Sequence, residues 1–152
     1  MRISFDIDDT LVCDPSVPVE RPLSRWGRLW FPEALRLGAP GLMRALIDRR
    51  HEVWIYTTSY RSPLYVQGWL RSYRVPVSGV VNQRRHERVV GRGGPSKFPP
   101  AFGIQLHVDD SPGVAAEGRR HGFAVVVVAP GDADWVERIL DAVAGRRPGN
   151  PL

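Results

Sequence analysis

The chain has 152 residues, of which 43% are hydrophobic and 24% are charged. These values suit one soluble globular domain and exclude a fibrous or largely disordered protein. The longest apolar runs, such as residues 124–130, are far too short to span a bilayer, and a single cysteine excludes an intramolecular disulfide. Since no charged-then-apolar signal segment precedes the first apolar run, we expect a cytoplasmic protein.

The formal net charge of +5 comes largely from clustered arginines. The two clusters are Arg21, Arg25 and Arg28, and Arg84, Arg85, Arg88 and Arg92. Such clusters could meet nucleic acid or a phosphorylated substrate. A merely solvated surface has the same composition, so the charge by itself does not choose between these alternatives.

The first predicted strand covers residues 3–7 and runs into three aspartates. Asp6 and Asp8 are two residues apart, so on a regular strand both side chains point to one face. Neighbouring carboxylates repel each other unless a cation or a donor compensates them. The carboxyl end of a strand in an open α/β sheet is where ligands bind, so we favour a ligand site here. The alternative is a turn or helix-capping cluster of aspartates.

Residues 11–38 are broken by prolines and carry large aromatic side chains, among them Trp26 and Trp30. We predict an irregular flap that could fold over a site. The alternative is that the aromatic side chains seal the edge of the core.

Strands and helices alternate along the rest of the chain. The predicted strands cover residues 53–56, 77–81, 106–108 and 123–128, the last one fully buried. The predicted helices cover residues 40–50, 62–73 and 111–122, and a last helix is capped by Asp132. The pattern indicates a three-layer, doubly wound α/β domain with a mostly parallel sheet over residues 1–145, followed by a disordered tail at 146–152.

Polar side chains follow three of the predicted strands. They are Asp6 and Asp8, then Thr57, then Asp109 and Asp110. Lys97, the only lysine in the chain, lies just upstream of the strand at 106–108. Because parallel strands place their carboxyl ends at one edge of the sheet, we expect these groups to converge.

In this order and spacing the four groups resemble the motifs of the haloacid dehalogenase (HAD) superfamily of phosphohydrolases. The resemblance covers nearly the whole chain. Family members often insert a cap domain between these motifs, but the intervals here are short, so the chain looks like a member with a minimal cap or none. The resemblance implies a HAD-like fold and a phosphatase that depends on Mg²⁺.

The resemblance also implies residue roles. Asp6 would be the nucleophile that forms an aspartyl phosphate, and Asp8 would be the general acid and then the general base. Thr57 would hydrogen-bond the phosphoryl group, and Lys97 would neutralise the phosphate and the nucleophile. The implied Mg²⁺ ligands are Asp6, the backbone carbonyl of Asp8, Asp109 and Asp110.

Other assignments stay open at this point. Thr58 could replace Thr57, and Arg61 could replace Lys97 as the cation. The candidate substrate contacts are Thr58, Arg61, Trp26, Trp30 and Asn82. A receiver-like signalling domain fits less well, since its phosphorylated aspartate should end a middle strand, where this chain has Thr57. An inactive domain that binds nucleic acid through the basic stretch at 82–95 is a further alternative, and an open site could also be completed by a second subunit.

Overall fold

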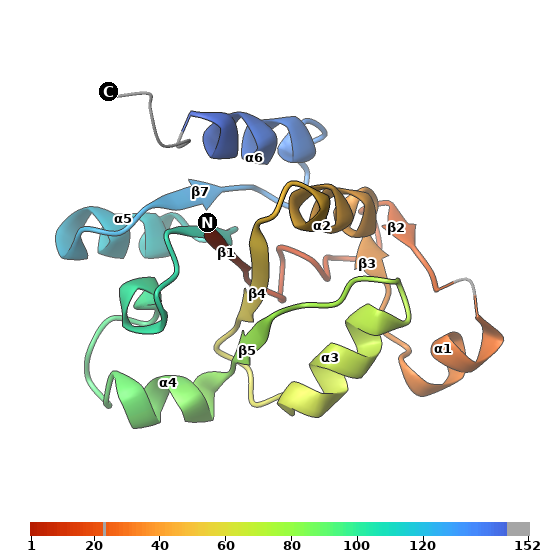
Figure 1. Cartoon of the computed structure of the whole chain (residues 1–152), viewed down its shortest axis with the longest axis horizontal. Helices are drawn as coiled ribbons and strands as arrows, with labels where there is room; N and C mark the ends of the chain where they lie inside the picture. The colour runs from red at the N-terminus through yellow and green to blue at the C-terminus, as the bar shows by residue number, and fades with distance from the viewer. Residues whose placement is uncertain (23, 146–152) are drawn as a thin grey trace.

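We analysed a computed structural model that describes residues 1–22 and 24–145. Its centre is a five-stranded parallel sheet in the order β5-β4-β1-β6-β7 (Figure 1). The strands are β1 (Arg2–Phe5), β4 (Glu52–Tyr56), β5 (Gly79–Val81), β6 (Leu106–Asp109) and β7 (Val125–Val127). The predicted parallel α/β architecture is therefore confirmed, and no large cap domain interrupts it.

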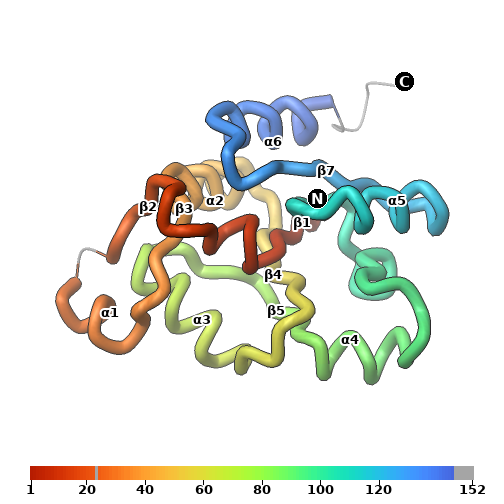
Figure 2. The backbone as a smooth tube through the Cα atoms, turned by 180° about the vertical axis from the view of Figure 1, so that it is seen from behind, coloured from red at the N-terminus to blue at the C-terminus, as the bar shows by residue number. Residues whose placement is uncertain are grey.

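Helices cover both faces of this sheet (Figures 1 and 2). On one face lie α2 (Ala39–Asp48), α3 (Pro63–Arg71) and α6 (Trp135–Ala144). On the other lie α4 (Gln83–Val89), the short 3-10 helix η1 (Pro99–Phe102) and α5 (Pro112–His121). The α2, α3 and α5 helices match predicted ones, and each has proline in its first turn, where a missing N–H costs no hydrogen bond.

The two faces of the central strands differ in polarity. Ile3 and Phe5 of β1 point into the main hydrophobic core with the apolar residues of β4 and β6. Ser4 points to the opposite face, where the register sets it beside His107 of β6. This second face has only a small apolar cluster around Tyr56 and Phe102. It therefore has room for polar side chains that lead up to the carboxyl edge.

The segment at 11–38 is more regular than predicted. It forms a two-stranded antiparallel ribbon of β2 (Val19–Glu20) and β3 (Leu35–Arg36), with α1 (Arg25–Trp30) between them. The Ser24 hydroxyl accepts a hydrogen bond from the Gly27 N–H and caps α1. Trp26 and Trp30 are 71% and 69% exposed, so they do not seal the core.

Two further predictions are wrong in detail. The strand predicted as fully buried is half-buried, because β7 lies at the edge of the sheet with only β6 beside it. The last helix begins after Asp134, and Asp132 instead accepts a hydrogen bond from the Asp134 N–H in the preceding turn. The basic stretch at 82–95 contains α4, which begins where the Asn82 side chain caps the Arg85 N–H.

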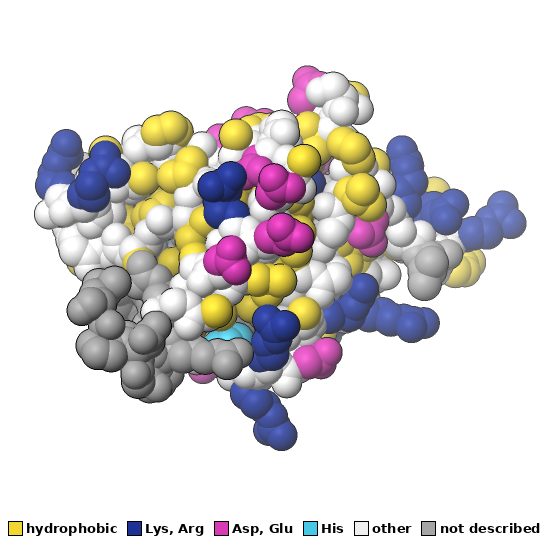
Figure 3. All heavy atoms as spheres, turned by 90° about the horizontal axis from the view of Figure 1, so that it is seen from above, with side chains coloured by type: hydrophobic (Ala, Val, Ile, Leu, Met, Phe, Trp, Pro, Cys, Tyr) yellow, Lys and Arg dark blue, Asp and Glu magenta, His cyan; other side chains and the backbone are white. Residues whose placement is uncertain are grey.

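Charged side chains of both signs occur on the face that carries α6. Acidic side chains gather near its centre and most basic ones lie toward its edges (Figure 3). No helix within the described ranges is long and apolar enough to cross a membrane. The tail at 146–152, which we predict to be disordered, lies outside the described residues.

Candidate active site

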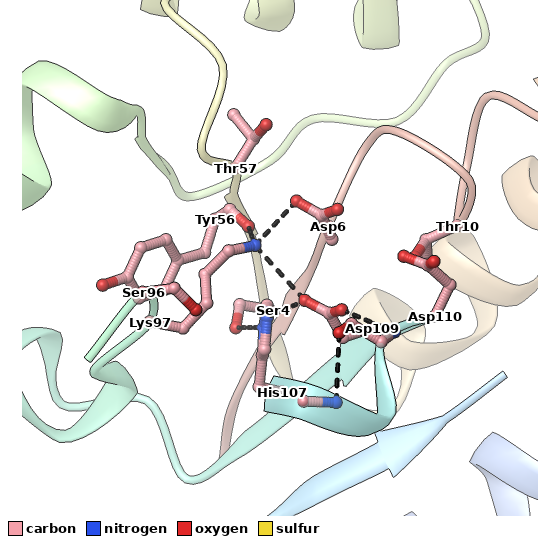
Figure 4. A network of polar contacts seen from close by, with 12 residues as sticks. Ser4, Asp6, Thr10, Tyr56, Thr57, Ser96, Lys97, His107, Asp109 and Asp110 are labelled. Atoms are coloured by element: carbon pink, nitrogen blue, oxygen red, sulfur yellow. Dashed lines mark hydrogen bonds and ion pairs between the residues drawn. The ribbon is translucent and has the colours of Figure 1, made fainter. Parts of the chain in front are cut away.

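Polar side chains converge at the carboxyl ends of β1, β4 and β6 (Figure 4). Asp6 directly follows β1, Thr57 directly follows β4, and Asp109 is the last residue of β6. Strand pairing continues past β1, since the Asp6 N–H donates to the Val108 carbonyl at 2.9 Å. The backbone ladder thus fixes Asp6 and Asp109 on neighbouring strands.

Three carboxylates form the centre of this cluster. One oxygen each of Asp6, Asp109 and Asp110 lies within 4.8 Å of the others. Burial raises the pKa of Asp6 to about 6, with Asp109 adding to the shift and Lys97 opposing it. Burial and the neighbouring Asp109 also raise the pKa of Asp110. The site therefore concentrates more negative charge than its own donors compensate.

Lys97 supplies the cation of the cluster. Its Nζ donates to Asp6 Oδ1 at 2.7 Å, to the Tyr56 carbonyl at 2.8 Å and to Asp109 Oδ2 at 3.3 Å. The side chain is 2% exposed, and its Nζ also lies 5.3 Å from the centroid of the Tyr56 ring. The loop before η1 thus delivers the ammonium group to the same edge as the aspartates.

Asp109 is fixed by a buried chain of hydrogen bonds beneath the site. His107 Nε2 lies 2.9 Å from Asp109 Oδ2, and His107 Nδ1 lies 2.8 Å from the Ser4 hydroxyl. Burial lowers the pKa of His107 to about 4, so the ring is neutral at pH 7. Burial alone would raise the pKa of Asp109, but the hydrogen bond with His107 and the charge of Lys97 prevail and lower it to about 2. These contacts therefore favour the ionised form of Asp109.

Asp8 is held apart from the other three carboxylates. Arg61 binds it in a bidentate pair, with both N–O distances at 2.9 Å. The same guanidinium binds Glu33 of the 11–38 segment at 2.6 Å. These bonds raise the pKa of Arg61, and the bond to Asp8 has a larger effect than the bond to Glu33. Because the Asp8 side chain is 53% exposed, it can rotate between Arg61 and a bound substrate.

The remaining predicted site residues have distinct environments. Thr57 is fully buried and its Oγ1 accepts a hydrogen bond from the Ser59 N–H at 3.1 Å, whereas Thr58 is exposed. Asn82 is buried, and its amide donates to the Arg61 carbonyl at 3.1 Å. Trp26 and Trp30 lie on α1 and are exposed.

Comparison with known proteins gives a fold but no sequence relative. No protein-family model matches the chain, and no curated protein sequence matches it significantly. Among solved structures, the HAD domain of the effector protein Lem4 from Legionella pneumophila aligns with 94% of this chain and 93% of its own, at a TM-score of 0.52 and 13% identity. A predicted HAD-like family hydrolase from Porphyromonas gingivalis aligns over 97% and 98%, at a TM-score of 0.54 and 14% identity. The chain has a HAD-like fold.

In this HAD-like fold the donor set suits a hard divalent cation. Mg²⁺ prefers oxygen ligands, and the three clustered carboxylates provide them. Thr10 supports this arrangement, since its hydroxyl donates to Asp110 Oδ1 at 3.4 Å. The residues present therefore fit Mg²⁺.

Sequence reasoning missed three residues of this HAD-like site. Ser4 and His107 each precede an aspartate of the cluster by two residues, so the period of a strand places them on the same face as that aspartate. This period was a usable signal. No sequence pattern marks Glu33 as a site residue, because only the tertiary fold of the 11–38 segment brings it to Arg61.

Proposed function

We propose that this protein is a Mg²⁺-dependent phosphatase that hydrolyses a phosphomonoester through an aspartyl phosphate on Asp6. The observation that carries the proposal is the position of Asp6 beside both the ammonium group of Lys97 and the carboxylates of Asp109 and Asp110. A carboxylate in that position can attack phosphorus only if positive charge receives the transferred oxygens. Lys97 and a divalent cation would supply it.

In the proposed first step, a carboxylate oxygen of Asp6 attacks phosphorus and the bond to the ester oxygen breaks. Once Asp8 has released Arg61 and taken up a proton from solvent, the leaving alkoxide takes that proton from the Asp8 carboxyl group. In this proposal Thr57 donates its hydroxyl proton to a phosphoryl oxygen, a proton that remains available because the Thr57 oxygen accepts from the Ser59 N–H. The products are a free alcohol and a phosphate ester of Asp6.

In the proposed second step, water attacks the aspartyl phosphate. Asp8, now ionised, removes a proton from that water, and the bond between phosphorus and the Asp6 oxygen breaks to release inorganic phosphate. Asp8 must stay apart from Arg61 during both steps, because both of its oxygens are bound to the guanidinium group in the resting pair. The phosphoryl group is an anion, and its oxygens can bind the Arg61 guanidinium group that Asp8 has released.

Asp6, Asp109 and Asp110 would hold the Mg²⁺ ion, with the backbone carbonyl of Asp8 as the further ligand that the family resemblance implies. When bound, the ion shields the phosphomonoester dianion from the carboxylate that attacks it. His107 keeps Asp109 turned toward this position, and Thr10 does the same for Asp110.

The test is hydrolysis of a panel of sugar phosphates, nucleotides and phosphopeptides, with and without Mg²⁺. We expect at least one phosphomonoester to be hydrolysed, and we expect Asp6→Asn to reduce kcat by a factor of 10³ or more. Asp48→Asn, which changes an exposed aspartate on α2, is the matched control and should keep full activity. An Asp6→Asn variant as active as the wild type would refute the nucleophile assignment. Mass spectrometry of acid-quenched wild type should detect the phosphoryl group on Asp6.

A further inference from the structure

Four arginines and one glutamate lie between residues 83 and 92, on and just after α4. Two of the arginines serve the fold. Arg85 donates to the Val80 carbonyl at 2.9 Å and lies over the Trp54 ring, and Arg92 pairs with Glu87 at 3.2 Å. The other two are not accounted for by these contacts.

Arg84 and Arg88 are exposed, and among the described residues neither has an ion-pair or hydrogen-bond partner for its side chain. They are four residues apart on α4, so their side chains project from the same side of the helix. Two unpaired guanidinium groups side by side repel each other slightly, and an anion with more than one charge would relieve that repulsion.

Two hollows lie beside α4. The first, of about 480 Å³, is lined by Thr58 and Ser96, the chain neighbours of Thr57 and Lys97. The second, of about 630 Å³, is lined by Arg84 and Arg88. Tyr60 lines both hollows and is 60% exposed.

α4 is fixed rigidly to the site, although it lies outside it. His86, on the inner side of α4, hydrogen-bonds the Tyr56 hydroxyl through Nδ1 at 2.5 Å. The carbonyl of Tyr56 accepts from Lys97, which binds Asp6. Hydrogen bonds therefore link the helix that carries Arg84 and Arg88 to the nucleophile.

We infer that the substrate is a single-stranded nucleic acid whose terminal phosphate enters the Asp6–Lys97 site while its chain lies along Tyr60 and α4. This inference rests on the proposed phosphatase function. Arginines that track a phosphate backbone and an exposed aromatic ring on which a base can stack are the two features that single-strand binding uses. Arg84 and Arg88 would contact backbone phosphates, and Tyr60 would stack on a base between them and the site.

The alternatives fit this surface less well. Arg84 and Arg88 line the second hollow and not the first, so a small phosphorylated metabolite in the first hollow would not contact them. A phosphopeptide has one phosphate and no need of two further unpaired arginines. The opposite face of the molecule, which carries α6, has acidic side chains at its centre (Figure 3).

Binding can be measured by fluorescence anisotropy with the Asp6→Asn protein, which keeps the surface but does not consume the probe. The probes are labelled DNA and RNA strands of about twelve nucleotides with a terminal phosphate. We expect the affinity to fall as salt rises. Each phosphate contact on a single strand contributes about 0.7 to the slope of log K against log salt. Removing two contacts by Arg84→Gln with Arg88→Gln should lower that slope by about 1.4.

Between about 50 and 200 mM salt, this difference makes the affinity of the parent protein fall about sevenfold more than that of the double variant. Arg119→Gln with Arg120→Gln, an equal change in charge on exposed residues of α5, is the control and should leave the slope unchanged. Equal slopes for all three proteins would overturn the inference. So would an acidic phosphopeptide that binds as tightly as the oligonucleotides.

Kinetics separate this inference from the proposed function. With Asp6 intact, the Arg84→Gln, Arg88→Gln protein should hydrolyse a small phosphomonoester such as p-nitrophenyl phosphate at the wild-type rate, and show a raised KM for a terminally phosphorylated oligonucleotide. Hydrolysis of the small ester without binding of oligonucleotides would refute only the substrate class. Binding of oligonucleotides without any hydrolysis would refute the phosphatase.

Discussion

At the scale of single residues, the candidate site holds an electrostatic conflict. Asp6 is buried beside Asp109 and Asp110, and Lys97 compensates only part of this charge. A cluster of this kind is unfavourable for the folded chain unless a ligand balances it. The conflict is the physical signature that distinguishes a site for a cation from an ordinary surface group of acids.

This conflict predicts how stability depends on pH. The pKa of Asp6 is about 6 in the folded chain against an ordinary value of 3.8, so the folded state binds the proton more tightly. Its contribution is fully present below about pH 4 and is lost as the pH rises to about 6. Asp6→Asn removes this loss, and we expect the variant to be more stable than the wild type at pH 7 by up to about 3 kcal/mol.

Urea unfolding at pH 4 and pH 7 without divalent cations measures this difference. The advantage of the Asp6→Asn variant should shrink toward pH 4, and Asp48→Asn should show no such trend. An Asp6→Asn protein that is less stable than the wild type at pH 7 would mean that the ion pair with Lys97 outweighs the cost of burial.

His107 offers a second residue-scale test. His107→Leu keeps this strand position filled and buried but removes the hydrogen bond to Asp109. Because residues behind a metal ligand orient it, we expect Mg²⁺ to bind 10- to 100-fold more weakly, as measured by calorimetric titration. His121→Leu, an exposed change at the end of α5, is the control. Unchanged Mg²⁺ affinity in His107→Leu would show that Asp109 is positioned by other contacts.

At the scale of elements, the 11–38 segment is tied to the site through one side chain. Glu33 binds Arg61, which binds Asp8, and the Glu33 carbonyl accepts from the Trp69 indole of α3 at 2.9 Å. The segment therefore couples α1 and β3 to the proposed general acid. Trp26 and Trp30 of its short helix are exposed, whereas Gly27 is buried.

Glu33→Gln should loosen this connection. A hydrogen bond between charged groups contributes about 1.5–3 kcal/mol, so we expect faster amide hydrogen exchange across residues 25–36 with little change in the central sheet. Glu137→Gln on the exposed side of α6 is the matched control. Exchange that is unchanged throughout 25–36 would show that the backbone contacts of the segment suffice to hold it.

At the scale of the whole molecule, ligand binding should be visible as stability. A cation that binds only the folded chain stabilises it by about 2.7 kcal/mol at one hundred times its Kd. For a domain of this size that corresponds to a rise in Tm of about 5–10 °C. We expect Mg²⁺ to give such a shift in a thermal scan, and Asp109→Asn with Asp110→Asn to abolish it. A shift that persists in the double variant would place the ion elsewhere.

The sequence by itself determined the parallel α/β architecture and the edge at which the polar groups meet. Buried strands such as β4 are nearly continuous apolar runs, and Ser-Pro pairs mark the starts of α3 and α5. These signals act within a short segment of the chain and depend little on the tertiary fold. The convergence of Asp6, Asp109 and Lys97 followed from topology, because parallel strands share one carboxyl edge.

Tertiary structure decided what depends on distant partners. It made β7 an edge strand, ordered the 11–38 segment, joined Glu33 and Arg61 to Asp8, and aligned Ser4 with His107 beneath Asp109. No local pattern encodes these outcomes, because each is an interaction between segments far apart in the chain. Burial and charge, which set the pKa of Asp6, likewise exist only once the chain has folded.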